Sequence, residues 1–346
     1  MKKIKVSIVG GSGYTGIELL RLLCQHPMVE IYQITSRADK GRLVSDIYSS
    51  LRGYLSHKFV DPKEADLINS DIVFFATPNG IAMQYAQALV DKGVKVIDLA
   101  ADFRIKNIDE WEHWYEMKHS SKSLLKEAVY GLPEINRKKI KNARIVANPG
   151  CYPTAIQLGL VPLIKNKLID VKSIIADAKS GTSGAGKKHE TNLLMSESAE
   201  NFNAYGLSGH RHLPEIEENL SSLLLDEHVN LTFVPHLLPM VRGIYATMYV
   251  DALEDFDISD LYNSYYLNEP FVDVLSYGEC PDIKSVRASN MCRISFQQKK
   301  DSNKIIILSV IDNLVKGAAG QAVQNMNIMM DFDETDGLKN LIPLHP

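Results

Sequence analysis

One cysteine of the 346-residue chain lies where a thiol could act as a nucleophile. Cys151 follows a Pro-Gly turn and precedes a stretch with the composition of a helix, and Pro153 is acceptable only in the first turn of that helix. The positive end of a helix stabilises a thiolate, which attacks acyl groups and can later leave again. We therefore predict that Cys151 is nucleophilic, whereas Cys24, Cys280 and Cys292 are expected to be small buried apolar residues.

Side chains that could move protons gather in the sequence GHRHLPE at 209–215. His210 and His212 are candidates for the acid or base that exchanges a proton with the thiol, and the pattern does not decide between them. Two histidines at this spacing could also share a metal ion, but further ligands at useful spacing are lacking, so we expect no metal site. Arg211 and Arg242 are candidate binders of a substrate anion, the alternative for each being a surface salt bridge.

A glycine-rich turn near the start of the chain has the spacing of a phosphate-binding loop. Residues 10–16 read GGSGYTG between a strand-like run and a helical pattern, and they satisfy Gly-x-Gly-x-x-Gly. Glycines let the backbone approach a pyrophosphate, whose charge then meets the amides at the helix N-terminus. We predict a dinucleotide site formed by Gly10, Gly11, Ser12, Gly13, Tyr14, Thr15 and Gly16.

The end of the next strand-like run bears on which dinucleotide is bound. An acidic residue there would bind the ribose 2′-hydroxyl of NAD, whereas this chain has Thr35, Ser36 and Arg37. A hydroxyl followed by a guanidinium suits a 2′-phosphate, because arginine offers a planar fork of donors and a permanent charge. Ser36 and Arg37 therefore predict NADP, the alternative being that Arg37 is a solvated surface residue.

A second glycine-rich segment, SGTSGAG at 180–186, follows another strand-like run. Its backbone amides and its hydroxyls, including those of Ser180 and Thr182, could form a cradle for a phosphate or for the cofactor. A flexible hairpin is the alternative.

The elements that must position these residues divide the chain in two. Apolar, β-branched runs alternate with helical patterns over the first 150 residues, as in a Rossmann-type, doubly wound α/β domain with a parallel sheet. A helix over 151–166 and a succession of strands then predict an α+β domain with a largely antiparallel sheet. A final helix is expected over 316–330. The segment 102–139 is expected to run over the surface, with a lid as the alternative.

Composition excludes several classes of protein. Hydrophobic residues make up 45% of the chain, enough for about two domains with cores of their own. The net charge of −4 lacks the positive field of nucleic-acid binders, and the longest apolar runs fall short of the ~20 residues that span a bilayer. The four cysteines show no paired spacing, so a reducing cytoplasm is the expected location.

Five segments together resemble the N-acetyl-gamma-glutamyl-phosphate reductase family, NADP-dependent enzymes of arginine biosynthesis. They are GGSGYTG at 10–16, ANPGCYPTA at 147–155, SGTSGAG at 180–186, GHRHLPEI at 209–216 and DNLVKGAAGQAVQN at 312–325. The resemblance implies a fold like that of aspartate-semialdehyde dehydrogenase, with an NADP-binding domain at 1–148 plus 316–346 and a catalytic and oligomerisation domain at 149–315. It also implies that Cys151 accepts the acyl group, that Gly184 lies near the nicotinamide and that Asn313 contacts its carboxamide.

The reaction implied is the NADPH-dependent reduction of N-acetyl-L-glutamyl 5-phosphate to N-acetyl-L-glutamate 5-semialdehyde and phosphate, through a thioester on Cys151. Members of this family are usually homodimers or homotetramers. Three alternatives remain: the related reductase of lysine biosynthesis, aspartate-semialdehyde dehydrogenase, and a nucleotide-sensing protein without the chemistry. The lysine enzyme acts on a substrate attached to an acidic carrier protein, and a net charge of −4 does not favour binding such a carrier.

Overall fold

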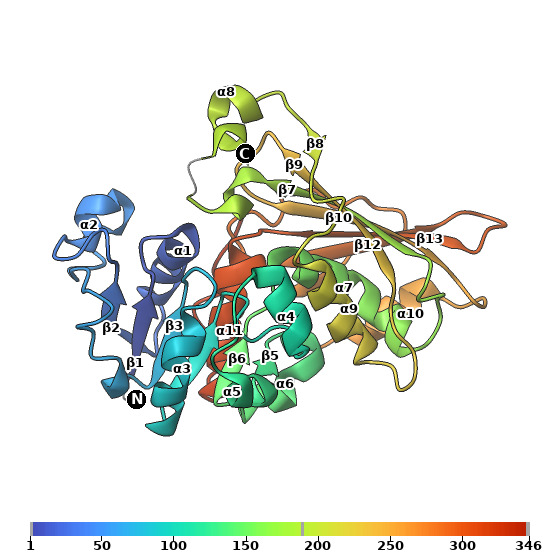
Figure 1. Cartoon of the computed structure of the whole chain (residues 1–346). Helices are drawn as coiled ribbons and strands as arrows, with labels where there is room; N and C mark the ends of the chain where they lie inside the picture. The colour runs from blue at the N-terminus through green and yellow to red at the C-terminus, as the bar shows by residue number, and fades with distance from the viewer. Residues whose placement is uncertain (1–2, 188–189, 344–346) are drawn as a thin grey trace. The chain divides into compact units, whose positions relative to one another are not determined.

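The computed structural model describes residues 3–187 and 190–343, which form two compact units (Figure 1). The first unit combines 3–149 with 318–340, and the second combines the described residues of 150–317 with 341–343. The chain therefore passes between the units three times, after Pro149, after Gly317 and after Asn340.

The first unit contains a parallel six-stranded sheet with the strand order β2-β1-β3-β4-β6-β5. Its strands are β1 (Ile4–Val9), β2 (Val29–Thr35), β3 (Ile72–Phe75), β4 (Lys95–Asp98), β5 (Val129–Tyr130) and β6 (Ile145–Ala147). Its helices are α1 (Tyr14–Leu23), α2 (Val44–Ile47), α3 (Ala82–Asp91), α4 (Ile108–Tyr115), α5 (Lys122–Glu127), α6 (Pro133–Lys141) and α11 (Gly320–Met329), with 3-10 turns at Ser49–Leu51 and Leu67–Asn69. Because β2 and β3 lie on opposite sides of β1, the strand order reverses at the carboxyl end of β1, which is where such sheets bind ligands.

Both faces of this sheet are buried, as the prediction of a doubly wound domain requires. Val73 and Phe75 of β3 share a core with side chains of α3, α4 and α5, while the alternate residues Ile72 and Phe74 are buried on the other face. The C-terminal helix α11 contacts α1, α6 and β4. Trp111 of α4 lies fully inside the core, so the expectation that 102–139 forms a surface segment is wrong.

The second unit contains a seven-stranded sheet with the order β11-β12-β13-β10-β7-β9-β8. Its strands are β7 (Ile174–Gly181), β8 (Asn203–Ala204), β9 (Leu231–Leu238), β10 (Ile244–Asp251), β11 (Val272–Val274), β12 (Cys292–Gln298) and β13 (Lys304–Ile311). Its helices are α7 (Cys151–Lys165), α8 (Met195–Ser198), α9 (Leu213–Ser221) and α10 (Ile258–Tyr266), with 3-10 turns at Thr182–Ala185 and Thr191–Leu193.

This second sheet is mixed, so the prediction of a largely antiparallel sheet is wrong. β7 pairs with β9 in parallel, as β11 does with β12, and the other neighbours are antiparallel. The reason is the long connection between β7 and β9, which includes α9 and returns the chain to the end of the sheet where β7 began. The sequence shows strand-like runs but not the direction in which each strand returns.

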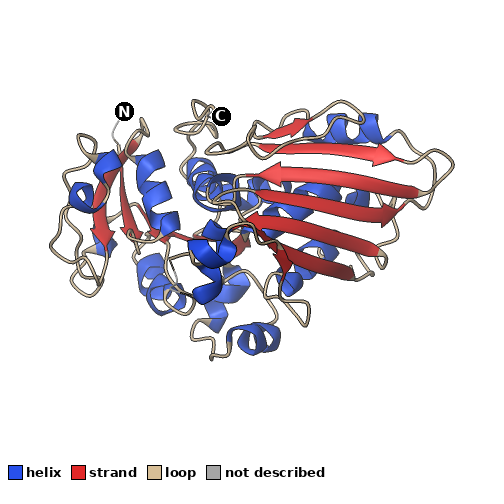
Figure 2. Cartoon of the chain, turned by 90° about the horizontal axis from the view of Figure 1, so that it is seen from above, coloured by secondary structure: helices blue, strands red, loops and turns tan. Residues whose placement is uncertain are grey.

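The helices α7, α9 and α10 lie together on one side of this sheet (Figure 1). The strand β10 alternates accordingly, with Ile244, Ala246 and Met248 buried and with Tyr245 and Tyr249 half-buried on the opposite face. Figure 2 looks onto the broad sheet with helices behind its strands.

The predicted C-terminal helix consists of two different pieces. A π-helix, Val315–Ala319, comes first, and α11 begins directly after it at Gly320. Single π turns of this kind are frequent near functional sites. None of the helices within 3–187 and 190–343 has the length and hydropathy to cross a membrane.

Candidate active site

Cys151 is the first residue of α7, a helix of 15 residues that begins where the turn after β6 ends. The preceding residue, Gly150, donates its backbone N–H to the Oε1 atom of Glu215 at 2.8 Å. On another side, Gly317 of the π-helix lies so close that a Cβ atom there would stand 2.8 Å from the Cβ of Cys151. The thiol is therefore held at the positive end of α7 by contacts within the second unit.

Cys151 opens into a cavity of about 220 Å³ in the second unit. The residues that line it are Cys151, Tyr152, Ser180, Gly181, Gly184, Ala185, Glu190, Asn192, Leu193, Asn203, Tyr205, His210, Arg211, His212 and Leu237. The fold thus brings together six residues singled out from the sequence, which come from α7, the end of β7, the 3-10 turn after it and the segment before α9. The lining contains a thiol, two imidazoles, a guanidinium and three hydroxyls.

The imidazole of His210 is enclosed by three aromatic rings. Those of Tyr152, Tyr205 and Phe233 lie edge-on to it, with centroids at 5.9, 5.6 and 5.3 Å. This burial, together with the positive charge of Arg211, lowers the pKa of His210 to about 4. His210 is therefore neutral at physiological pH.

The protonated nitrogen of neutral His210 follows from its hydrogen bonding. The backbone N–H of His212 donates to the Nδ1 atom of His210 at 3.1 Å. Because Nδ1 accepts, the proton of the neutral ring resides on Nε2. His210 can accordingly donate a hydrogen bond through Nε2, a property that sequence spacing could not reveal.

Two tyrosines of the cavity were not predicted. The hydroxyl of Tyr205 donates to that of Tyr152 at 3.2 Å, and Tyr152 donates to the carbonyl oxygen of His236 at 3.1 Å. Burial raises the pKa of both phenols, that of Tyr205 to about 12, so both keep their protons at neutral pH. Tyr152 adjoins Cys151 in sequence, which was an available signal, whereas nothing in the sequence marks Tyr205.

Two of the predicted anion-binding residues are not among the described residues that line the cavity. Arg242 forms an ion pair of 3.4 Å with Asp312, which is fully buried, so the contact is an ion pair but not the surface salt bridge considered as the alternative. The hydroxyl of Thr182 donates to the carbonyl oxygen of Met240 at 3.2 Å. Ser180 and Arg211, by contrast, do line the cavity.

The glycine-rich segment at 180–186 does not present its first amides to a ligand. The backbone N–H groups of Gly181, Thr182 and Ser183 donate to the carbonyl oxygens of three residues in the segment 240–243. An anion cradle built from these amides is therefore excluded, because each donor already has an acceptor. The segment instead closes one wall of the cavity.

Asn313 is buried within the second unit and uses both ends of its side-chain amide there. Its Oδ1 atom accepts the N–H of Gly243 at 2.7 Å, and its Nδ2 atom donates to the hydroxyl of Ser183 at 2.9 Å. One N–H of the amide remains for any further partner.

The glycine-rich turn of the first unit fits a pyrophosphate. A Cβ atom at Gly16 would overlap the carbonyl oxygen of Gly10, so close packing of α1 on the turn requires glycine there. Gly13 caps α1, and a Cβ atom there would meet only the Gly10 oxygen, at 3.9 Å. Open space thus adjoins the helix N-terminus at Gly13, as approach of a phosphate to the backbone needs.

A chain of polar contacts lies at the end of β2. The hydroxyls of Ser12 and Ser36 are 2.9 Å apart, and Ser36 also donates to the carboxylate of Asp39 at 3.2 Å. Asp39 in turn forms an ion pair of 3.1 Å with Arg42. Arg37 is exposed, and no hydrogen bond or ion pair of its side chain is found within the described ranges. Sequence reasoning missed Asp39, which lies two residues beyond Arg37.

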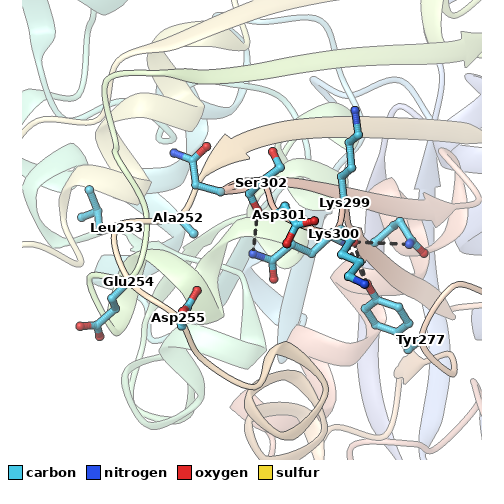
Figure 3. Close-up of a pocket in the computed structure, with 12 residues that line it drawn as sticks. Ala252, Leu253, Glu254, Asp255, Tyr277, Lys299, Lys300, Asp301 and Ser302 are labelled. Atoms are coloured by element: carbon cyan, nitrogen blue, oxygen red, sulfur yellow. Dashed lines mark hydrogen bonds between the residues drawn. The ribbon is translucent and has the colours of Figure 1, made fainter.

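A second hollow, of about 910 Å³, lies beside the loop that joins β12 to β13 (Figure 3). Its lining includes Glu254, Asp255, Tyr277, Lys299 and Lys300, and neither cysteine nor histidine is among the described residues there. No group of three or more His, Cys, Asp or Glu suited to a metal ion occurs in 3–187 or 190–343. The cavity at Cys151 is therefore the candidate site.

Comparison with known proteins assigns the chain to a family. The protein-family model described as "Semialdehyde dehydrogenase, NAD binding domain" matches residues 5–143. A second family model, "Semialdehyde dehydrogenase, dimerisation domain", matches residues 151–313. The N-acetyl-gamma-glutamyl-phosphate reductase of Laribacter hongkongensis (strain HLHK9) is 59% identical over 99% of this chain and 100% of its own length. The chain belongs to the N-acetyl-gamma-glutamyl-phosphate reductase family. Another N-acetyl-gamma-glutamyl-phosphate reductase, from Nitrosomonas europaea, is 57% identical with the same coverage, and the resemblance seen in the sequence is confirmed.

The fold of this member of the N-acetyl-gamma-glutamyl-phosphate reductase family is shared with more distant enzymes. Aspartate semialdehyde dehydrogenase II of Vibrio cholerae has a TM-score of 0.74 and 17% identity, covering 96% of this chain and 99% of that one. The Candida albicans aspartate semialdehyde dehydrogenase solved with NADP has a TM-score of 0.72 and 14% identity, covering 99% and 100%. At such identities the likeness concerns the fold alone.

Proposed function

We propose that this protein reduces N-acetyl-L-glutamyl 5-phosphate with NADPH to N-acetyl-L-glutamate 5-semialdehyde and phosphate, as a step of arginine biosynthesis. The observation that carries the proposal is the meeting of Cys151, His210 and His212 in one cavity of a chain from this reductase family. A nucleophile beside imidazoles that can accept or donate a proton is the arrangement that acyl transfer requires.

The first half of the reaction is acyl transfer to sulfur. His212 takes the thiol proton, and the Cys151 thiolate, favoured by the N-terminus of α7, attacks the acyl carbon. A carbon–sulfur bond forms, the bond from carbon to the phosphate oxygen breaks, and phosphate leaves. Arg211 lines the cavity and supplies positive charge for an anionic group of the substrate.

The second half is reduction of the thioester. NADPH, when bound, supplies a hydride to the carbonyl carbon. The Nε2–H of His210 is the donor that we assign to the carbonyl oxygen, because Nδ1 of this ring is already an acceptor. Collapse of the hemithioacetal breaks the carbon–sulfur bond, releases the aldehyde and returns the thiolate of Cys151.

The first unit would hold the dinucleotide. The turn at 10–16 offers the helix N-terminus and the open approach at Gly13 to the pyrophosphate. Arg37, exposed beyond β2, would bind the 2′-phosphate of NADP, with Ser36 beside it. Gly184 lies in the cavity lining, which supports its predicted place near the nicotinamide, and the remaining N–H of Asn313 is the group left for a carboxamide.

We also propose that two copies of the chain associate through the second unit. On the sheet face away from α7, Ile175, Tyr249 and Ile306 lie side by side in register, and Ile175 is 40% exposed. Apolar side chains in a row on an open sheet face are typical of an interface. A cytoplasmic location stays a prediction from the sequence.

The reverse reaction tests the proposed function. We expect the purified chain to reduce NADP with N-acetyl-L-glutamate 5-semialdehyde only when inorganic phosphate is present, because phosphate must attack the thioester. Cys151→Ser should lower the rate by about 1,000-fold or more and leave NADPH binding nearly unchanged. A Cys151→Ala enzyme with normal turnover would overturn the mechanism.

Alternative substrates separate the remaining functions. Faster turnover of aspartate semialdehyde, or of a carrier-bound aminoadipate semialdehyde, would contradict the substrate proposed. Nucleotide binding without turnover and with slow iodoacetamide labelling of Cys151 would indicate a sensor instead.

A further inference from the structure

A buried carboxylate that the mechanism above does not use lies directly behind the Cys151 turn. Glu215 belongs to the first turn of α9 and is fully buried. Its Oε1 atom accepts the N–H of Gly150, the residue before the nucleophile, at 2.8 Å. A buried carboxyl group destabilises the fold unless it is hydrogen-bonded, so loss of this bond would displace or destabilise the turn before Cys151.

The place of Glu215 in the chain links the two halves of the candidate site. α9 begins directly after the segment that carries the two histidines, and His212 itself is the N-cap of the helix. The same helix packs against α7, the helix that Cys151 begins. A shift of Gly150 relative to α9 would therefore change the separation between the thiol and the imidazoles.

We infer that Glu215 is a positioning residue that keeps the Cys151 turn in register with the His210–His212 segment, an inference that rests on the proposed function. It acts through Gly150 and is not one of the described residues that line the cavity. This hydrogen bond matters because a displacement of about 1 Å of a reacting group can lower the catalytic rate on the order of 100-fold.

Two substitutions separate the hydrogen bond from other properties of the side chain. Glu215→Gln keeps an oxygen acceptor for Gly150, whereas Glu215→Leu has a similar size and no acceptor. Both are uncharged, so their comparison separates loss of the polar acceptor from loss of the charge. The matched control is Glu217→Leu on the same helix, since Glu217 also accepts a backbone N–H, that of Leu231 at 2.9 Å, away from the turn.

Three quantities are measured on the full-length chain. They are the rate of iodoacetamide alkylation of Cys151 at neutral pH, followed by mass spectrometry of its peptide, together with kcat and the KM for NADPH. We expect Glu215→Leu to lose about tenfold or more in alkylation rate and in kcat, with the KM for NADPH unchanged. Glu215→Gln should stay within about threefold of the original chain, and Glu217→Leu should keep both rates even if it melts earlier.

A folded Glu215→Leu chain with unchanged alkylation and kcat would overturn the inference. Equal impairment of the Gln and Leu variants, or of the Glu217→Leu control, would also overturn it, because the effect would then not follow the hydrogen bond. Should the Leu variant fail to fold, Glu215→Asp replaces it, because its side chain is one methylene shorter and moves the acceptor away from Gly150. The same losses in alkylation rate and kcat are then expected of Glu215→Asp. Alkylation needs no turnover, so it decides the role of Glu215 even if the proposed function fails.

Discussion

At the scale of single residues, the site depends on contacts that hold one sulfur atom in place. Cys151 is bounded by Gly150 before it in the chain and by Gly317 in space. Neither glycine has a side chain that could take part in the chemistry. The missing side chain of Gly317 leaves space that lets the π-helix approach the Cα and Cβ atoms of Cys151 closely.

Gly317→Ala is expected to disturb the nucleophile. The added methyl would stand 2.8 Å from the Cβ of Cys151, closer than two carbon atoms pack, so one of the two must move. We expect kcat to fall by about tenfold or more with little change in the affinity for NADPH, as measured by steady-state kinetics and fluorescence titration. A folded variant with unchanged kcat would show that this contact does not position the thiol.

Arg37→Asp is expected to change the preference between the two dinucleotides. A carboxylate in place of the guanidinium would repel the 2′-phosphate of NADP and could accept the 2′-hydroxyl of NAD. The ratio of kcat/KM for NADPH to that for NADH should fall by about 100-fold, while Arg37→Lys should give an intermediate ratio. Asp39→Asn is the opposing control, since removing its negative charge beside Ser36 should favour NADPH further.

At the scale of elements, each candidate site residue lies at or beside the end of a helix or strand. Cys151 begins α7, the histidines precede α9, and Ser180 lies near the end of β7. Ends of elements expose side chains and backbone amides to a cavity while the rest of the element remains packed. The aromatic rings around His210 come from α7, from β9 and from the residue after β8, and this burial together with the charge of Arg211 lowers its pKa.

His210 is expected to make the stability of the protein depend on pH. Its pKa lies near 4 in the folded chain against 6.5 without burial, so the unfolded chain takes up a proton first as the pH falls. Stability is therefore lost between about pH 6.5 and about pH 4 and is fully present above that window. The thermal midpoint of His210→Gln should fall less than that of the original chain between about pH 7 and about pH 5. An equal fall in both would contradict the assignment of a neutral, buried His210.

At the scale of the whole molecule, the two units have different proposed roles, and each consists of two separate segments of the chain. The C-terminal helix α11 returns to the first unit, where it contacts α1, α6 and β4. The second unit contains the entire lining of the candidate cavity. The face of its sheet that lies away from α7 is the one proposed for association of copies.

Tyr249→Glu is expected to weaken that association. A carboxylate in the row formed with Ile175 and Ile306 would have to be buried without a partner in the proposed interface. Light scattering should show a lower molar mass for this variant, while Leu225→Glu, at a residue 90% exposed in a loop of the same unit, should keep the original mass. An unchanged mass for Tyr249→Glu would place the interface elsewhere.

The sequence by itself determined the local features of this protein. Strand–turn–helix at 10–16, the helix that begins at Cys151 and the alternation of strands and helices in the first unit follow from residue order, because turns, caps and apolar spacing act over a few residues. The family could be identified from five short segments for the same reason, because the characteristic residues of each segment are contiguous in the sequence.

Only the tertiary structure decided what depends on distant parts of the chain. The parallel pairing of β7 with β9, the packing of Phe233 against His210 and the bond from Gly150 to Glu215 each join residues well separated in sequence. The burial of Trp111 likewise depends on packing between elements. The pairing of Arg242 with Asp312, which takes that arginine away from the cavity lining, is of the same kind. Such contacts form only when elements pack against one another. Packing determines the burial of each side chain, the dielectric around it and the direction of each strand together, and no local sequence pattern encodes these properties.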